Sequence, residues 1–256
     1  MKMHRPASRV SRIAILTVLL GGFALLAMSA PATAQGVTIG FGDGAGLTER
    51  TVQIIALITI MSLAPSILVM VTSFTRIVVV LSLLRTAIGV QQSPPNTVVI
   101  SLALFLTAFV MGPVFQKAYD AGIKPLIAEE IEINQAFDRA SKPFQGFMMS
   151  HVREKDLSLF MDLSGDKRPE KAEDVSLRVL VPAFMISELK RAFEIGFLLF
   201  VPFIVIDMVV ASVLMSMGMM MLPPVIISLP FKLIFFVLVD GWHLVAGSLV
   251  QSYGGG

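Results

Sequence analysis

Long apolar segments alternate with short polar ones along the chain. Four segments are long enough to be called hydrophobic blocks, and they are residues 52–71, 97–116, 193–221 and 225–251. A membrane helix needs about 20 apolar residues to cross ~30 Å of hydrocarbon, and each block supplies that length. The pattern predicts an all-α membrane protein built from hydrophobic helical hairpins, with a further helical segment in the periplasm.

Prolines and polar residues divide the chain further. Pro65 lies inside the first block and predicts a kink or break, because proline removes a backbone hydrogen bond. Pro223 and Pro224 separate the last two blocks and predict the tip of a hairpin. We predict a signal peptide at 1–34, a glycine-rich linker at 35–50, a hydrophobic helical pair at 51–116, a periplasmic helical region at 117–176, a C-terminal hydrophobic hairpin at 177–250 and a disordered tail at 251–256.

The first 34 residues have the three parts of a secretory signal. Four basic residues come first, residues 13–28 are apolar, and Ala32, Thr33 and Ala34 are the small residues that a signal peptidase needs. We therefore predict cleavage after Ala34 and a mature N-terminus in the periplasm of a bacterium. The alternative is a first transmembrane helix that stays attached. The glycines that follow fit neither the dinucleotide-binding nor the P-loop spacing.

Composition supports a membrane protein and excludes several functions. The chain is 55% hydrophobic and 15% charged, whereas a soluble domain carries about a quarter charged residues. A net charge of +2 argues against a nucleic-acid partner. Because there is no cysteine, disulfides, cysteine-based zinc sites and thiol catalysis are excluded. Of the 38 charged residues, 26 lie within residues 117–194, which separates that region from the hydrophobic blocks.

Basic residues indicate a topology. Arg76 and Arg85 follow the first block without any acidic residue between them. Cytoplasmic loops carry an excess of lysine and arginine, so we expect both arginines on the cytoplasmic side. The second block then returns the chain to the periplasm, and the hairpin tip after the third block points toward the cytoplasm.

Residues for enzymatic chemistry are scarce. His4 lies in the predicted signal, His151 lies among charged residues that predict a solvated helix face, and His243 follows Trp242 in the last block. No metalloprotease, nucleophile-elbow or calcium-loop motif occurs. We expect no catalytic residues, no metal site and no cofactor, which leaves an enzyme as a distant alternative.

Ionisable residues inside the last two blocks are expensive to place in a membrane and therefore informative. Asp207 lies 16 residues before Pro223 and Lys232 lies 8 residues after Pro224, so their heights in a straight hairpin differ by about 12 Å. Asp207 and Lys232 pair more easily if they belong to neighbouring subunits, or if the second helix breaks at Pro230. Asp240 matches Asp207 in height. These residues form either a subunit-locking or proton-responsive network, or a simple structural ion pair.

Methionines concentrate at the predicted tip. Five occur in ten residues, and they are Met215, Met217, Met219, Met220 and Met221. One interpretation is a thioether site for Cu(I), but alternate residues of a helix point about 200° apart and cannot converge in one chain. A second interpretation is that the methionines only fill apolar positions on a membrane helix. We favour a deformable hydrophobic constriction that closes a pore, with Gly218, Pro223 and Pro224 as the hinge.

The chain resembles the FliP family of flagellar type III export-gate proteins over residues 51–250. The stretches that carry the resemblance are FTRIVVVLSLLRTAIGVQQSPPN, LALFLTAFVMGPVF, VPAFMISELKRAFEIGFLLFVPFIVIDMVVASVLMSMGMMMLPP and LPFKLIFFVLVDGWHLV. An injectisome export-gate protein, used in virulence, is the related alternative. The signal and the extended region between the second and third blocks favour the flagellar branch.

The resemblance implies a function. Five copies assemble with FliQ and FliR, alongside FlhB and other export components, into a closed helical ring or cone at the flagellar basal body of the inner membrane. Unfolded flagellar proteins pass through this gate. In the family the methionine-rich loop is a gasket, which corresponds to the five methionines named above, and charged positions correspond to Asp207 and Lys232. The assembled gate lies largely above the membrane plane, so the blocks need not each span it. The rival from another class is a methionine-rich Cu(I) transporter.

Overall fold

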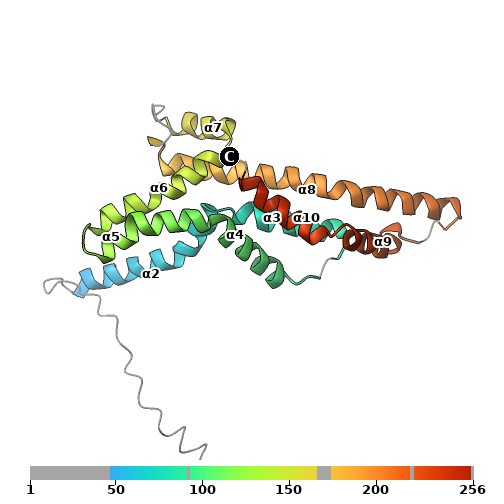
Figure 1. Ribbon diagram of the computed structural model, residues 1–256, viewed down its shortest axis with the longest axis horizontal. Helices are drawn as coiled ribbons and strands as arrows, with labels where there is room; N and C mark the ends of the chain where they lie inside the picture. The colour runs from blue at the N-terminus through green and yellow to red at the C-terminus, as the bar shows by residue number, and fades with distance from the viewer. Residues whose placement is uncertain (1–46, 91–92, 166–173, 220–221, 255–256) are drawn as a thin grey trace, which may run out of the picture. The chain divides into compact units, whose positions relative to one another are not determined.

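The computed structural model describes residues 47–90, 93–165, 174–219 and 222–254, and Figure 1 shows their helices. Every regular element in these ranges is helical, which confirms the predicted all-α class. The chain divides into two compact units, residues 1–56 and 57–256. Only the beginning of one helix is described in the first unit. The predicted signal peptide lies outside the described residues.

The predicted helical pair at 51–116 consists of three helices. They are α2 (Leu47–Met70), α3 (Phe74–Ile88) and α4 (Asn96–Ala118). α2 starts inside the predicted linker and continues through Pro65, so the helix does not break at that proline, and a kink there stays a prediction. The direction of the chain changes instead between α2 and α3, by 67°. A proline is tolerated inside an apolar helix when neighbouring groups satisfy the freed carbonyl.

The described part of the charged region is largely helical, as predicted. After α4 come a π-helical turn, η1 (Tyr119–Ile123), and α5 (Lys124–Ile127), followed by α6 (Ile133–His151) and α7 (Glu154–Ser164). α6 packs against α4 and η1. The contact is close at Gly122, where an added Cβ would lie 2.5 Å from the carbonyl oxygen of Ala136. Glycine is required here because only its missing side chain lets the two backbones approach.

The C-terminal hairpin is longer and more bent than predicted. Its first arm is α8 (Leu177–Ser216), a helix of 40 residues. Its second arm is divided into α9 (Pro224–Leu238) and α10 (Gly241–Gly254), which meet at 62°. The disordered tail expected from residue 251 is wrong for residues 251–254, which complete α10 and include the buried Tyr253.

α3 is the centre of the core. It packs against α8, α4 and α9, and its inward side chains are almost fully buried. Those side chains are Ile77, Val80, Leu81, Leu84, Ala87 and Ile88. A second apolar cluster joins α6 and α7 to the start of α8 around Met148, Leu180 and Phe184. Burying each large apolar side chain stabilises the fold by roughly 1.5–3 kcal/mol. α3 is therefore a core helix, although its sequence is as apolar as those of the neighbouring helices.

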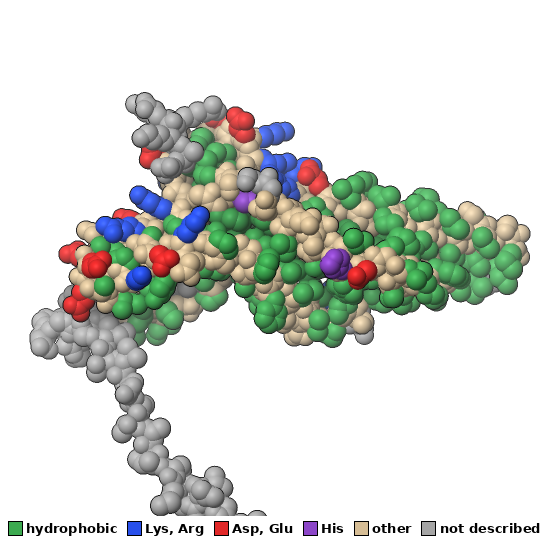
Figure 2. Space-filling view, in the orientation of Figure 1, with side chains coloured by type: hydrophobic (Ala, Val, Ile, Leu, Met, Phe, Trp, Pro, Cys, Tyr) green, Lys and Arg blue, Asp and Glu red, His purple; other side chains and the backbone are tan. Residues whose placement is uncertain are grey.

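Among the described residues, two helical segments are long and apolar enough to cross a membrane, Asn96–Ile127 and Leu177–Ser216. The number rises to four if each of the bent pairs, α2 with α3 and α9 with α10, counts as one span. Judged by length and composition alone, this upper number of spans agrees with the four hydrophobic blocks of the sequence. Figure 2 shows hydrophobic side chains gathered over the hairpin of α8 and α9.

A polar clamp joins the beginning of α7 to α8. Arg153 donates two hydrogen bonds to the carboxylate of Asp156, at 2.7 and 2.8 Å, and the hydroxyl of Ser187 donates to the same carboxylate at 2.6 Å. The backbone N–H of Arg153 donates to Ser187 in turn, at 3.0 Å. The hydrogen bonds from Arg153, with that from Ser187, hold the pKa of Asp156 below its ordinary value although burial opposes them.

The clamp predicts an acid-dependent loss of stability. A carboxyl whose folded pKa is lowered stabilises the protein above its unfolded pKa, about 3.9, and this stabilisation is lost as pH falls through the folded pKa. We expect the thermal unfolding midpoint to fall between pH 5 and pH 3 by several degrees more in the natural protein than in Asp156→Asn. The exposed neighbour Glu154→Gln is the control and keeps the natural pH dependence. If the unfolding midpoints of the natural protein and Asp156→Asn fell in parallel as the pH was lowered, the stabilising role of the clamp would be contradicted.

Candidate functional site

The tip of the C-terminal hairpin begins where α8 ends. Gly218 has a φ of +74°, its N–H donates to the carbonyl of Met215 at 3.1 Å, and the N–H of Met219 donates to the carbonyl of Leu214 at 3.0 Å. These two bonds form a Schellman motif, in which the residue after the helix takes the left-handed conformation that glycine adopts without strain. Gly218 therefore ends α8 at a defined point and orders the chain through Met219.

The other side of the tip begins at the proline pair. Pro223 is the N-cap of α9 and Pro224 is its first residue. Proline suits this position because the first N–H groups of a helix have no partner within the helix. Together the glycine and the two prolines limit the connection to residues 217–223, as the sequence predicted for a hairpin tip. Whether these three residues act as a hinge stays a prediction.

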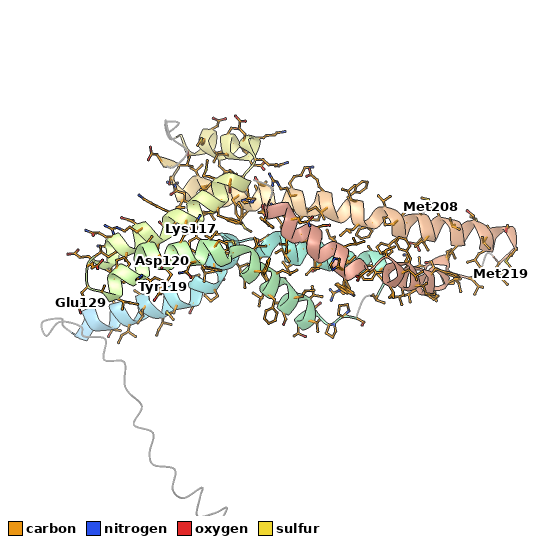
Figure 3. The ribbon with its side chains drawn as sticks, in the orientation of Figure 1. Lys117, Tyr119, Asp120, Glu129, Met208 and Met219 are labelled. Atoms are coloured by element: carbon orange, nitrogen blue, oxygen red, sulfur yellow. The ribbon has the colours of Figure 1, made fainter. Side chains whose placement is uncertain are left out.

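Three methionines of the tip are described, and all are exposed. The exposed fraction is 62% for Met215, 64% for Met217 and 45% for Met219. Met220 and Met221 lie outside the described residues. Figure 3 shows Met219 at the end of the hairpin and Met208 farther along α8. The structure thus presents apolar sulfur-containing side chains to the surroundings of the tip.

An apolar groove of about 490 Å³ lies between the two arms next to the tip. Only aliphatic and aromatic side chains line it, and they are Val205, Ile206, Val209, Val210, Val213, Leu214, Ile227 and Phe231. The two arms therefore do not fill the space between them beside the tip. Polar contacts of Asp207, Ser228 and Lys232 join the arms along the same stretch.

Asp207 and Lys232 form an ion pair between the arms. The Nζ of Lys232 lies 2.6 Å from Oδ2 of Asp207, and the hydroxyl of Ser228 donates to Oδ1. Lys232 and Ser228 are buried, whereas the Asp207 side chain keeps 31% of its exposure. Both carboxylate oxygens thus have a partner, which a charge in an apolar hairpin requires.

The predicted height difference of about 12 Å between Asp207 and Lys232 is wrong. That difference requires all 16 residues from Asp207 to the prolines to be helical, but α8 stops at Ser216. Counted from the helix ends, Asp207 is nine residues from Ser216 and Lys232 is eight from Pro224, a height difference of about 1.5 Å. One chain therefore makes the pair without help from a neighbour or a break at Pro230.

Asp240 does not belong to a buried network with this pair. It lies between α9 and α10, is exposed, and has a φ of +50°. The bend between the helices removes it from the line of α9, which is why counting residues along a straight helix placed it wrongly. Aspartate is among the residues that tolerate the left-handed conformation at such a turn.

Breaking the inter-arm pair is expected to destabilise the hairpin. Asp207→Asn leaves the Lys232 ammonium buried without a carboxylate, and we expect a loss toward the lower end of roughly 3–5 kcal/mol because Asp207 keeps some exposure. The measurement is denaturant unfolding in detergent, together with the yield of assembled complex. Glu194→Gln, at a carboxylate that is 54% exposed on the same helix, is the matched control. Equal losses in the two variants would refute a structural role for the pair.

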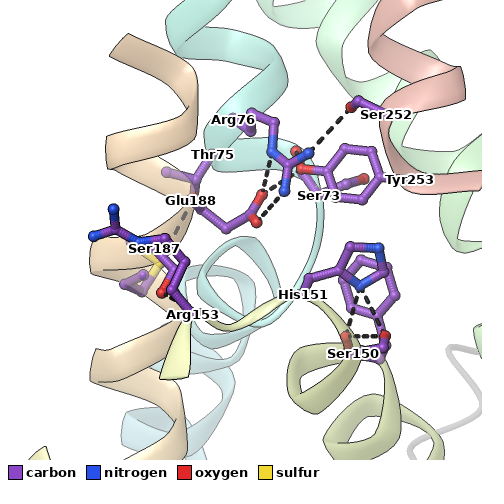
Figure 4. Close-up of polar contacts among 12 residues, drawn as sticks. Ser73, Thr75, Arg76, Ser150, His151, Arg153, Ser187, Glu188, Ser252 and Tyr253 are labelled. Atoms are coloured by element: carbon purple, nitrogen blue, oxygen red, sulfur yellow. Dashed lines mark hydrogen bonds and ion pairs between the residues drawn. The ribbon is translucent and has the colours of Figure 1, made fainter. Parts of the chain in front are cut away.

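A second charged cluster lies in the core and was missed by the sequence analysis (Figure 4). Arg76 of α3 and Glu188 of α8 are 1% and 0% exposed and pair through two hydrogen bonds, one of them 2.8 Å between Nε and Oε2. The guanidinium lies 3.9 Å from the ring centroid of Tyr253 and donates to Ser252 at 3.1 Å. The hydroxyl of Tyr253 donates to Glu188.

This cluster corrects the interpretation of the two arginines. Arg76 is a buried partner of Glu188, so it is not a free basic residue of a loop, and its predicted position on the cytoplasmic side stays a prediction. Arg85 is partly exposed and its Nη1 donates to the side chain of Asn96. The cytoplasmic position predicted for Arg85 stays a prediction.

The predicted solvated position of His151 is also wrong. It is 8% exposed, with Nδ1 2.8 Å from the carbonyl oxygen of Phe147, so it is not on a solvated face. Its ring packs against Phe147 and Tyr253, at centroid distances of 4.6 and 5.1 Å. The end of α6 thus contacts the same tyrosine that the Arg76–Glu188 pair holds.

One sequence signal could have revealed the role of the C-terminus. Gly241, Val245, Leu249 and Tyr253 recur every four residues and are all buried. This spacing is typical of one face of a helix. Within the described residues, no group of three or more histidine, aspartate or glutamate side chains could hold a metal ion.

Comparison with known proteins places the chain among flagellar relatives. Residues 57–249 match the FliP family. The chain is 66% identical over 248 residues to flagellar biosynthetic protein FliP of Caulobacter vibrioides, covering 96% of this chain and 93% of that protein. It is 55% identical over 205 residues to the Bacillus subtilis protein of the same name, and the alignment covers 80% of this chain and 93% of that protein. It is 48% identical over 236 residues to the Rhizobium meliloti protein of that name, and the alignment covers 90% of this chain and 96% of that protein.

Proposed function

The chain belongs to the FliP family, and on that premise we propose that it is a core subunit of the flagellar protein-export gate. In this proposal it helps to form the channel through which unfolded flagellar proteins cross the inner membrane. The single observation that carries the proposal is the hairpin tip, where a capped and salt-bridged pair of helices presents exposed methionines. The similar proteins compared above are all flagellar, which favours this branch over an injectisome role.

Large exposed apolar side chains support assembly with other subunits. α8 alone exposes Phe193, Phe197, Leu198, Met208 and Val209 by more than half. Isolated surfaces of soluble proteins rarely expose so much contiguous apolar area, so partners or lipid cover these faces. We propose a homo-oligomer of five copies with FliQ and FliR, in contact with FlhB, in the inner membrane of the flagellar basal body. The helical region from α6 to α7 forms the periplasmic portion.

The tip closes the pore in this account. Methionine has an unbranched, polarizable side chain that adapts to irregular surfaces, so a ring of such tips excludes water and ions without polar contacts. The same adaptability lets the ring part for cargo of variable shape. The Asp207–Lys232 pair and the Schellman motif at Gly218 keep the two arms in register, so that the closing surface is presented from a rigid support.

Replacing all five methionines by leucine distinguishes this function from copper transport. A leucine ring is equally apolar but has no sulfur ligand and less adaptable side chains. We expect closed-gate ion conductance to stay unchanged while the rate of flagellar protein export falls severalfold. Cellular copper content is the second measurement. A fall in copper uptake with export intact would overturn the gate and favour the Cu(I) transporter.

A further inference from the structure

The exposed methionines of the hairpin differ sharply from those in the core. Met215, Met217 and Met219 are 62%, 64% and 45% exposed, whereas Met111 and Met148 are 0% and 1% exposed. Peroxide reaches a thioether only where solvent does. In the single chain the methionines of the tip are therefore open to the surroundings, whereas Met111 and Met148 are enclosed by the chain itself.

The chemistry available to these exposed sulfurs is oxidation to the sulfoxide. The thioether sulfur attacks one oxygen of a hydroperoxide, the O–O bond breaks, and the sulfur gains one oxygen. Sulfur is oxidised by two electrons, and the hydroperoxide is reduced to water or an alcohol. The chain contains no cysteine that would react first. The product replaces a flexible apolar side chain by a polar one.

We propose that Met215, Met217 and Met219 are an oxidative modification site at which peroxide opens the closed gate. This inference rests on the proposed function, because it assigns a consequence to a change in the pore-closing surface. An apolar constriction excludes ions by remaining dry, and a sulfoxide oxygen binds water at that constriction. Because methionine sulfoxide is reversible by methionine sulfoxide reductases, the opening is reversible too.

The position of these residues makes the site specific. Met215 is in the last turn of α8, and Met217 and Met219 follow it, so all three lie at the tip rather than along the arm. Met208 provides a matched comparison, since it is 65% exposed on the same helix but seven residues earlier, about 10 Å from Met215. Its oxidation should leave the tip apolar.

The experiment uses the assembled full-length complex in a planar bilayer with hydrogen peroxide as the probe. Peptide mass mapping measures sulfoxide at each methionine, and ion conductance is recorded before and after treatment. We expect sulfoxide at Met215, Met217 and Met219, none at Met111 or Met148, and a conductance rise of about tenfold, equivalent to about 1.4 kcal/mol. Treatment with methionine sulfoxide reductase should restore the initial conductance.

Two variants complete the test. The triple variant Met215→Leu, Met217→Leu, Met219→Leu should keep a low conductance that peroxide raises much less than in the natural complex, while Met208→Leu should respond like the natural complex. Unchanged conductance despite mapped sulfoxide at the tip would overturn this inference and leave the gate proposal standing. A response lost in Met208→Leu would also overturn it. A high conductance in the untreated natural complex would instead contradict the proposed function.

Discussion

Arg76→Met is expected to destabilise the protein by about 3–5 kcal/mol, the usual loss when one partner of a buried ion pair is removed. The variant leaves the fully buried carboxylate of Glu188 without its cation. It also removes the guanidinium from the face of Tyr253 and from Ser252, and thereby releases the end of α10 from α3. Denaturant unfolding in detergent measures the loss, and most of the variant should fail to accumulate in the membrane.

A matched control and a rescue sharpen this prediction. Lys190 and Glu194 form an ion pair on α8 but are 53% and 54% exposed, so Lys190→Ala should cost no more than about 1 kcal/mol. Replacing both buried partners, as Arg76→Met with Glu188→Gln, removes the unpaired charge and should recover much of the stability. If the double variant were as unstable as Arg76→Met alone, the unpaired carboxylate would not be the cause.

Local pattern predicted the elements well. Apolar runs of at least 20 residues identified α4 and α8, and the proline pair located the start of α9. The family resemblance, carried by four stretches of sequence, is confirmed by the match over residues 57–249. These features depend on residues that are near one another in the sequence, where helix length and capping rules apply directly.

Distant pairings were not predictable in the same way. Arg76 and Glu188 are separated by 112 residues, and nothing in either local sequence shows that α3 lies against α8. An arginine next to an apolar run indicates a side of the membrane, but it does not show that the side chain is also buried in an ion pair. Tyr253 was similarly assigned to a tail because the glycines after it suggested disorder.

The Asp207–Lys232 pair shows how one local boundary controls a distant conclusion. The residue types and their membrane cost correctly identified the two side chains as partners worth considering. Their relation within the chain was misjudged because the end of α8 was placed seven residues too late. Helix ends are the least certain part of any sequence argument, and here the ending depends on a single left-handed glycine, Gly218.

Shortening the tip is the second prediction with a large expected effect. Deleting residues 217–221 removes four of the five methionines and the cap at Gly218, while it keeps every residue of α8 and α9, including Asp207 and Lys232. If the tips form the closing surface, the shortened loops cannot meet across the pore. Bacteria that carry the deletion should lose the membrane potential and grow slowly. A deletion of equal length within residues 166–173, outside the hydrophobic blocks, is the control and should not cause a leak.

The most direct test of the central claim is the single-complex conductance of the purified gate in a planar bilayer, compared between the natural chain and the 217–221 deletion. Native mass determination of the same sample shows that both complexes contain the full set of subunits. The gate account predicts a closed natural complex and a constantly conducting deletion complex. Equal and negligible conductance of the two fully assembled complexes would contradict the claim that the methionine tip closes the pore.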